Sequence, residues 1–122
     1  EPGPAMATDS AYLAYCLEQL EPLGGVTARA MFGGHGLYRG GRMFGLIAYD
    51  ELYLKVTDAN RQMFVAAQSQ PFTYTGKGKP VQMSYWKVPE DVLEDSGTLK
   101  DWASAAWRAA MEQAPPPTKT RR

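Results

Sequence analysis

Three short apolar segments follow one another between residues 30 and 56, and the residues that separate them are typical of tight turns. Gly40 and Gly41 can supply the positive φ angles of a two-residue hairpin loop, and Asp50-Glu51 predicts a second turn. The cluster Gly33-Gly34-His35-Gly36 predicts a bulge or sharp bend in the first strand. An antiparallel β meander is therefore expected across this region.

Segments with helical periodicity lie on both sides of the meander. Before it, Leu13, Cys16 and Leu20 recur at helical spacing until Pro22 ends the pattern. After it, the sequence predicts a short helix beyond Thr57, strands over residues 72–75 and 81–88, and helices that begin near Pro89 and Thr98. The order helix, three strands, helix, two strands and terminal helices predicts an α+β fold, with helices packed on an antiparallel sheet of about five strands.

The last predicted helix carries two tryptophans, Trp102 and Trp107. Their separation corresponds to about 140° around a helix, so both rings cannot lie at the centre of one apolar stripe. Trp102 shares its row with Leu99, Ala106 and Ala110, and this row is expected to face the sheet. Trp107 is expected at the margin of the sheet or under a partner.

Characteristic short sequence runs in both halves of the chain support this fold. The runs that carry it are residues 30–38, 43–48, 52–56, 71–80 and 83–86. Together they resemble the N-terminal domain of the TfoX/Sxy family, from about Ser10 to Met111. The resemblance implies the same α+β fold in a bacterial protein linked to transcription and DNA uptake, because the family is named for regulators of natural competence. Full-length members carry a second, C-terminal domain, so the sequence resembles a stand-alone N-terminal domain.

A chain of 122 residues is long enough for one domain with a sizeable core. This domain is expected over residues 9–112. Residues 1–5 precede Met6, the first plausible start, so residues 1–8 are expected to be a cloning remnant followed by a disordered start. The proline-rich, basic residues 113–122 are expected to form a disordered tail.

The formal charge is balanced overall but uneven along the chain. Residues 29–87 hold eight basic and three acidic side chains, whereas residues 90–112 hold two basic and six acidic ones. The middle of the chain is thus expected to attract an acidic partner, unless the two regions neutralise each other across the fold. The single cysteine and the absence of a long apolar run favour a cytoplasmic protein without a membrane span.

Catalytic chemistry has little support in this sequence. One histidine and one cysteine are too few for a typical zinc site, and Cys16 lies on an apolar stripe where a core role is expected. No Gly-x-Ser-x-Gly elbow is present, and the carboxylate pairs lie at a turn and at a helix start. We therefore expect no catalytic residues, no metal site and no cofactor, and the sequence favours a function other than catalysis.

Three groups of residues are candidate binding surfaces. The glycine bend around His35 either locks the backbone or presents a hydrogen bond to a ligand. The Gly76-Lys77-Gly78-Lys79 tip could hold a phosphate, although a solvated hairpin tip is the simpler interpretation. Aromatic residues beside cations are typical of single-stranded nucleic-acid binding, but strand alternation must bury about half of these rings. The candidate binding residues are Phe32, Gly33, Gly34, His35, Lys55, Tyr74, Lys77, Lys79, Tyr85 and Trp86.

The sequence favours a non-catalytic interaction module, similar to the N-terminal domain of TfoX-type regulators, that acts through a protein partner or as a homodimer. No membrane contact is expected, and nucleic-acid binding is expected to be weak or absent because no duplex-reading module is present. The alternative is a small-ligand or phosphate-binding protein, or an enzyme, centred on His35, Lys55, Lys77 and Lys79. A polar pocket that joins these residues would favour the alternative, and a flat apolar patch would favour the interaction module.

Overall fold

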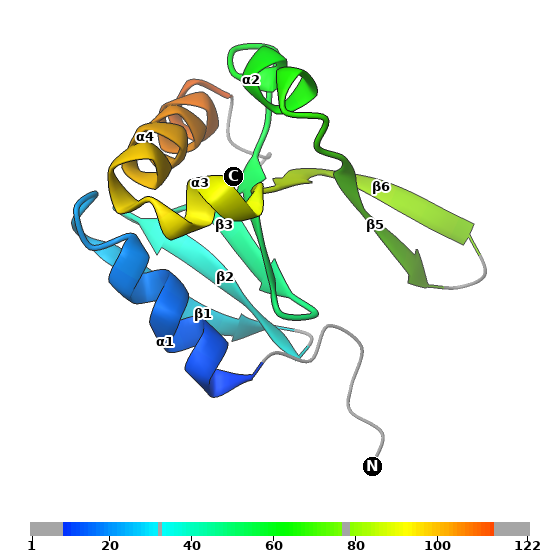
Figure 1. The fold of residues 1–122 in the computed structure, drawn as a ribbon. Coiled ribbons are helices and arrows are strands. Elements are labelled where there is room, and N and C mark those ends of the chain that lie inside the picture. The colour runs from blue at the N-terminus through cyan, green and yellow to red at the C-terminus, as the bar shows by residue number, and fades with distance from the viewer. Residues whose placement is uncertain (1–8, 32, 77–78, 114–122) are drawn as a thin grey trace, which may run out of the picture.

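The computed structural model describes residues 9–31, 33–76 and 79–113, without the side chains of residues 74–82. The expected remnant at residues 1–8 and nearly all of the expected tail lie outside the described residues, as do Phe32 and Lys77. The described chain has the expected α+β fold, with four helices and one antiparallel sheet of six strands (Figure 1). The elements are α1 (Ser10–Gln19), β1 (Val26–Met31), β2 (Gly34–Arg39), β3 (Arg42–Ala48), β4 (Glu51–Lys55), α2 (Arg61–Ala66), β5 (Pro71–Gly76), β6 (Lys79–Lys87), α3 (Glu90–Glu94) and α4 (Ser96–Glu112).

The sheet has the strand order β1-β2-β3-β4-β6-β5, so the first four strands form the expected meander and β6 pairs with β4. Six strands replace the expected five or so because the glycine cluster reverses the chain completely. Met31 pairs with Gly34 across a tight turn in which Gly33 has a φ of 84°. The segment expected to form one bent strand is therefore the hairpin β1–β2.

Both later turns of the meander contain residues with positive φ angles. Gly40 and Gly41 have φ values of 59° and 80°, as expected for a two-residue hairpin loop. The β3–β4 turn lies at Tyr49 and Asp50, one residue earlier than the expected Asp50-Glu51, and both residues have positive φ. Asp50 also accepts a hydrogen bond, 2.7 Å long, from the backbone N–H of Asp9 at the start of α1.

A β-bulge in β3 decides which side chains share a face. Tyr38 pairs with Met43 and Leu37 pairs with Gly45, so Phe44 is the extra residue. The bulge shifts the alternation by one position, and Phe44 and Ile47 join the core beneath the helices while Leu46 and Ala48 lie on the other face.

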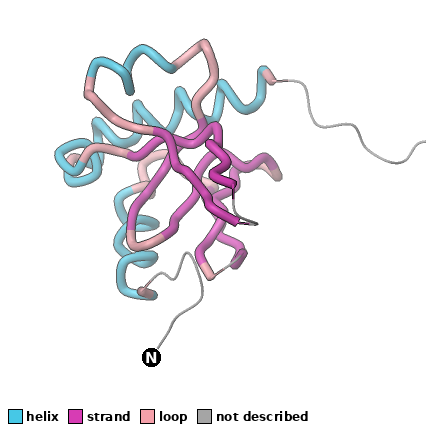
Figure 2. The backbone as a smooth tube through the Cα atoms, turned by 90° about the vertical axis from the view of Figure 1, so that its right-hand side faces the viewer, coloured by secondary structure: helices cyan, strands magenta, loops and turns pink. Residues whose placement is uncertain are grey.

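Helices α1, α3 and α4 cover one face of the strands β1 to β4 (Figure 1), and the perpendicular view shows helices mainly to one side of the strands (Figure 2). Asp95 begins α4 by accepting hydrogen bonds from the N–H groups of Gly97 and Thr98, so the helix starts two residues before the expected Thr98. Small residues let this helix approach the sheet closely. The buried residues of α4 are Leu99, Ala103, Ala106, Ala109 and Ala110.

The tryptophans of α4 are placed differently from the expectation. Trp102 is half-buried beside the alanine row, not at its centre, and packs edge-on against Phe64 of α2 with ring centroids 4.7 Å apart. Ala103 takes the central position because a row of small side chains allows a shorter distance between helix and sheet. Trp107 lies at the margin, as expected, where its indole N–H donates a 2.9 Å hydrogen bond to the carbonyl oxygen of Arg39.

Candidate functional site

The sheet has two unlike faces. The helix face lies beneath α1, α3 and α4, and the opposite face carries no helix in the described part of the chain (Figure 2). We call this opposite face the open face. Its described side chains are Thr27, Arg29, Met31, Tyr38, Met43, Leu46, Ala48, Glu51, Tyr53, Lys55, Phe72, Met83, Tyr85 and Lys87.

An apolar cluster occupies the centre of the open face. Leu46, Ala48, Phe72 and Tyr85 are buried in it, and half-buried methionine and tyrosine side chains surround them. Phe72 packs edge-on against one of these tyrosines, Tyr53, with ring centroids 4.9 Å apart. The side chains that cover these buried residues belong to the same face of the sheet.

Gly36 gives this cluster its shape. A Cβ atom at Gly36 would lie 3.0 Å from Sδ of Met31, 3.1 Å from Cε1 of Tyr38 and 3.2 Å from Cε of Met43. These three side chains therefore lean over the glycine from neighbouring strands. The result is a continuous surface of flexible methionine and rigid tyrosine side chains.

Two cations lie over aromatic rings of the open face. The Arg29 guanidinium is 5.3 Å from the ring centroid of Tyr38, and the Lys55 ammonium is 5.3 Å from that of Tyr85. Neither cation pairs with a carboxylate among the described side chains, whereas Lys87 lies 3.3 Å from a carboxylate oxygen of Glu51. Partial burial lowers the pKa of Lys55, since its ammonium has lost part of its hydration.

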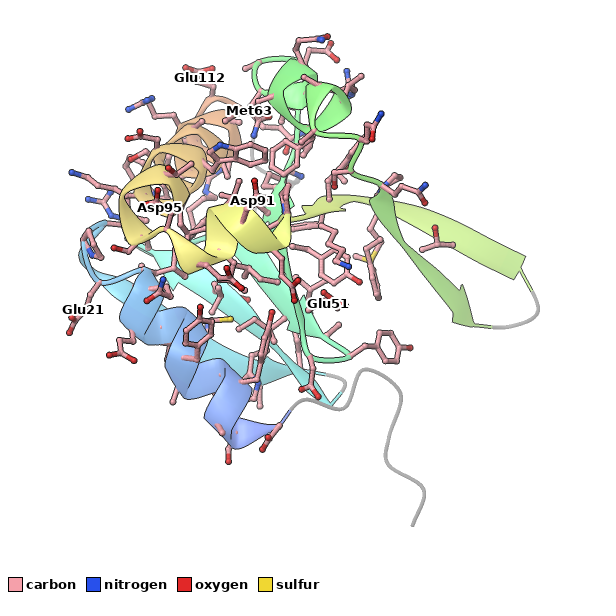
Figure 3. The ribbon with its side chains drawn as sticks, in the orientation of Figure 1. Glu21, Glu51, Met63, Asp91, Asp95 and Glu112 are labelled. Carbon is pink, nitrogen blue, oxygen red and sulfur yellow. The ribbon has the colours of Figure 1, made fainter. Side chains whose placement is uncertain are left out.

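The helical layer carries the opposite charge. Helices α1, α3 and α4 present six exposed carboxylates and two exposed cations. Figure 3 shows three acidic residues of this layer, Asp91, Asp95 and Glu112, on or beside α3 and α4. Among the described side chains, the open face holds Arg29, Lys55 and Lys87 against Glu51. Arg39 and Arg42, from the same basic stretch of the sequence, contact α4 on the other side of the sheet.

The structure brings only some of the predicted site residues together. Lys55, Tyr85 and Gly34 belong to the open face. Trp86 points to the helix face, where its ring centroid lies 6.3 Å from that of Phe64. Gly33 lies in the β1–β2 turn. Phe32 and Lys77 lie outside the described residues, and the side chains of Tyr74 and Lys79 are outside the description as well.

His35 also lies on the helix face, between Ala30 and Ile47. Its Nδ1 atom is buried and has no hydrogen-bond partner in the described structure. Since Lys55 projects from the opposite face, these two residues of the predicted ligand site cannot line one pocket.

Cys16 has the core position that its sequence context predicts. It lies on α1 and is completely buried, and burial raises the pKa of its thiol to about 11. The thiol is therefore protonated at neutral pH, which does not suit a nucleophile.

Sequence reasoning missed several residues of the open face, among them Arg29, Tyr38 and Met43. The sequence signal that could have found them is the alternation in the first strand. There Thr27, Arg29 and Met31 alternate with apolar residues and therefore share the other face of the strand. Register places Arg29 opposite Gly36, and the glycine leaves room for its neighbours to cover the sheet.

Replacement of a glycine by alanine should therefore have unequal effects on the two faces. Gly36→Ala should change the free energy of unfolding by less than about 1 kcal/mol, because the atoms it meets belong mainly to flexible side chains that can move outward. Gly45→Ala should cost about 1–3 kcal/mol, because its Cβ would lie 3.3 Å from Cβ of the fully buried Leu37. Urea denaturation of both variants measures the difference, and equal costs would contradict the assignment of the faces.

Alkaline pH should destabilise the open face through Tyr85. Burial, reinforced by the nearby Tyr38, raises the pKa of Tyr85 from 10.0 to about 12. The unfolded chain therefore ionises first, so this stability is complete below pH 10 and is lost as the pH rises toward 12. Between about pH 8 and about pH 11 the parent chain should lose about 1 kcal/mol more than Tyr85→Phe in urea denaturation. Equal losses would show that Tyr85 does not titrate in this way.

None of the helices in the described ranges is both long and apolar enough to cross a membrane.

The chain is similar in sequence to known proteins. The chain is 32% identical over 116 residues to an uncharacterized 12.7 kDa protein in the trpE 5' region of Spirochaeta aurantia, with 95% of this chain and 93% of that protein covered. It is 26% identical over 96 residues to protein Sxy of Escherichia coli (strain K12). That match covers 79% of this chain and 46% of Sxy.

The sequence pattern of the TfoX N-terminal domain matches residues 18–110, which include the whole sheet and most of the helical layer. The resemblance expected from the sequence is thereby confirmed. The chain belongs to the family of the TfoX N-terminal domain, a competence-regulator-like family.

Proposed function

We propose that this chain is a non-catalytic interaction module that acts by binding a protein through the open face of its sheet. The observation that carries the proposal is the apolar cluster around Leu46, which no helix of the described chain covers. Clustered apolar and aromatic side chains on a sheet surface mark interaction sites more often than scattered ones do. The regulatory role of such a module would follow from the partner that it holds.

The side chains of the open face suit a protein surface. Methionine adapts to varied partners, and tyrosine, methionine and arginine are enriched at protein interfaces. Stacking of nucleic-acid bases would need free ring faces, but the rings of Tyr38 and Tyr85 already lie beside cations, and Phe72 is buried. These contacts favour a protein over a single-stranded nucleic acid.

A second copy of the chain is a less favourable occupant of this face. In a two-fold symmetric dimer each residue of the patch meets the same patch of its partner. The open face would then bring Arg29, Lys55 and Lys87 of both copies together, and Glu51 is the one carboxylate among its described side chains to offset them. We therefore propose that a different protein binds the open face. Self-association is a separate outcome of the test below.

The small-ligand alternative has less support. Two of its four residues, His35 and Lys55, lie on opposite faces of the sheet. The other two, Lys77 and Lys79, have no described side chains. The geometry of the described residues thus favours the interaction module.

Site-specific photocrosslinking in the source cell tests this proposal. A benzoylphenylalanine in place of Tyr38 should give a discrete protein adduct, because Tyr38 lies on the open face. The matched control carries the same group in place of Tyr15, an exposed ring on α1 in the helical layer, and should give no such adduct.

Treatment with nuclease and protease identifies what has been trapped. A protein adduct survives nuclease and disappears with protease. Adducts from the Tyr15 position alone, or adducts that nuclease removes, would contradict the proposal. An adduct of twice the chain mass would assign the open face to self-association instead of a different protein.

A further inference from the structure

The open face carries its charge at two places that flank its apolar centre. Arg29 lies on the edge strand β1 and Lys55 on β4, three strand intervals away. Neighbouring strands are separated by about 4.8 Å, so the two backbone positions are about 15 Å apart. Leu46 and Met43 of β3 lie between them in the sheet order. Cation, apolar cluster and cation therefore follow one another across the sheet.

The positive charges of Arg29 and Lys55 are not compensated by a negative charge among the described side chains. Each lies beside a tyrosine ring, and neither has a carboxylate within ion-pair distance among the described side chains. Partial burial lowers the pKa of Lys55 because its ammonium has lost hydration, and an anion bound to the ammonium would compensate for that loss. The carboxylates of the chain itself lie mainly in the helical layer, on the other side of the sheet.

On these grounds, and resting on the proposed function above, we infer that the open face binds an acidic, amphipathic segment of the partner protein. Carboxylates of that segment pair with Arg29 and Lys55, and apolar side chains between them pack on Met43 and its neighbours. Carboxylates fit because each cation already has an aromatic contact and lacks only a counter-charge. The apolar centre between the cations excludes a purely acidic partner, since it would leave that centre in water.

Selection from a random peptide library displayed on phage tests this inference with the full chain as bait. The parent chain should enrich peptides that combine Asp or Glu with aromatic or aliphatic residues. The double variant Arg29→Glu/Lys55→Glu should lose the enrichment in acidic residues. The matched control Lys100→Glu/Arg108→Glu changes the charge equally on exposed positions of α4 and should select the same acidic peptides as the parent chain.

A synthetic peptide of the enriched sequence then gives affinities by fluorescence anisotropy. Its Kd should rise at least tenfold, about 1.4 kcal/mol, for the double variant and at high salt. Arg29→Gln/Lys55→Gln should show a loss in the same direction, and circular dichroism confirms that each variant is folded. Enrichment of neutral or basic peptides, or acidic peptides that bind the double variant as well as the parent chain, would overturn the inference.

A third variant separates this inference from the proposed function. Met43→Gln removes apolar surface from the open face without changing its charge. If binding depends on Met43 but not on the two cations, the open face binds protein and only the acidic partner is wrong. If binding depends on neither, or no peptide is enriched, the proposed function fails as well. Tighter binding of a labelled oligothymidine than of the peptide would assign the face to single-stranded nucleic acid and overturn both.

Discussion

The close packing of α4 against the sheet is the interaction on which the rest of the structure depends. Alanines at positions 103, 106 and 110 let the helix approach β3 and β4, and fully buried Phe44 and Ile47 fill the space beneath the helical layer. Trp102 and Trp107 brace the two margins of the helix by contacts with Phe64 and with the backbone of Arg39. Because the helices gather on one side, the other side of the described sheet has only its own side chains to cover it.

The same packing decides which cations are free to bind a partner. Arg39 and Arg42 of the β2–β3 hairpin are held by α4: one lies over the ring of Trp107, and the other donates a 3.0 Å hydrogen bond to the carbonyl oxygen of Ala110. A cation at the C-terminal end of a helix also offsets the helix dipole. Arg29 and Lys55 point to the other face, where each lies beside a tyrosine ring and neither pairs with a carboxylate among the described side chains.

The sequence predicts the fold better than the site because turns and periodicity are local signals, whereas a binding face depends on register. The glycine pair at 40–41 and the apolar stripe of α4 were sufficient to predict an antiparallel sheet with a helical layer. The complete reversal at Gly33 and the bulge at Phe44 were not predicted, and a one-residue shift exchanges the two faces of a strand. For this reason His35 and Lys55, grouped by their chemistry in the sequence, lie on opposite faces, and Arg29 was missed.

The exposure of the open face in the free protein is the central claim, and methionine methyl NMR with a soluble paramagnetic agent measures it most directly. The ε-methyl groups of Met31 and Met43 should relax clearly faster in the presence of the agent than the methyl groups of the buried Leu46 and Leu54. The enhancement should not depend on protein concentration. Methionine signals as protected as those of the buried leucines, or protection that grows with concentration, would mean that the face is already covered and would contradict the account.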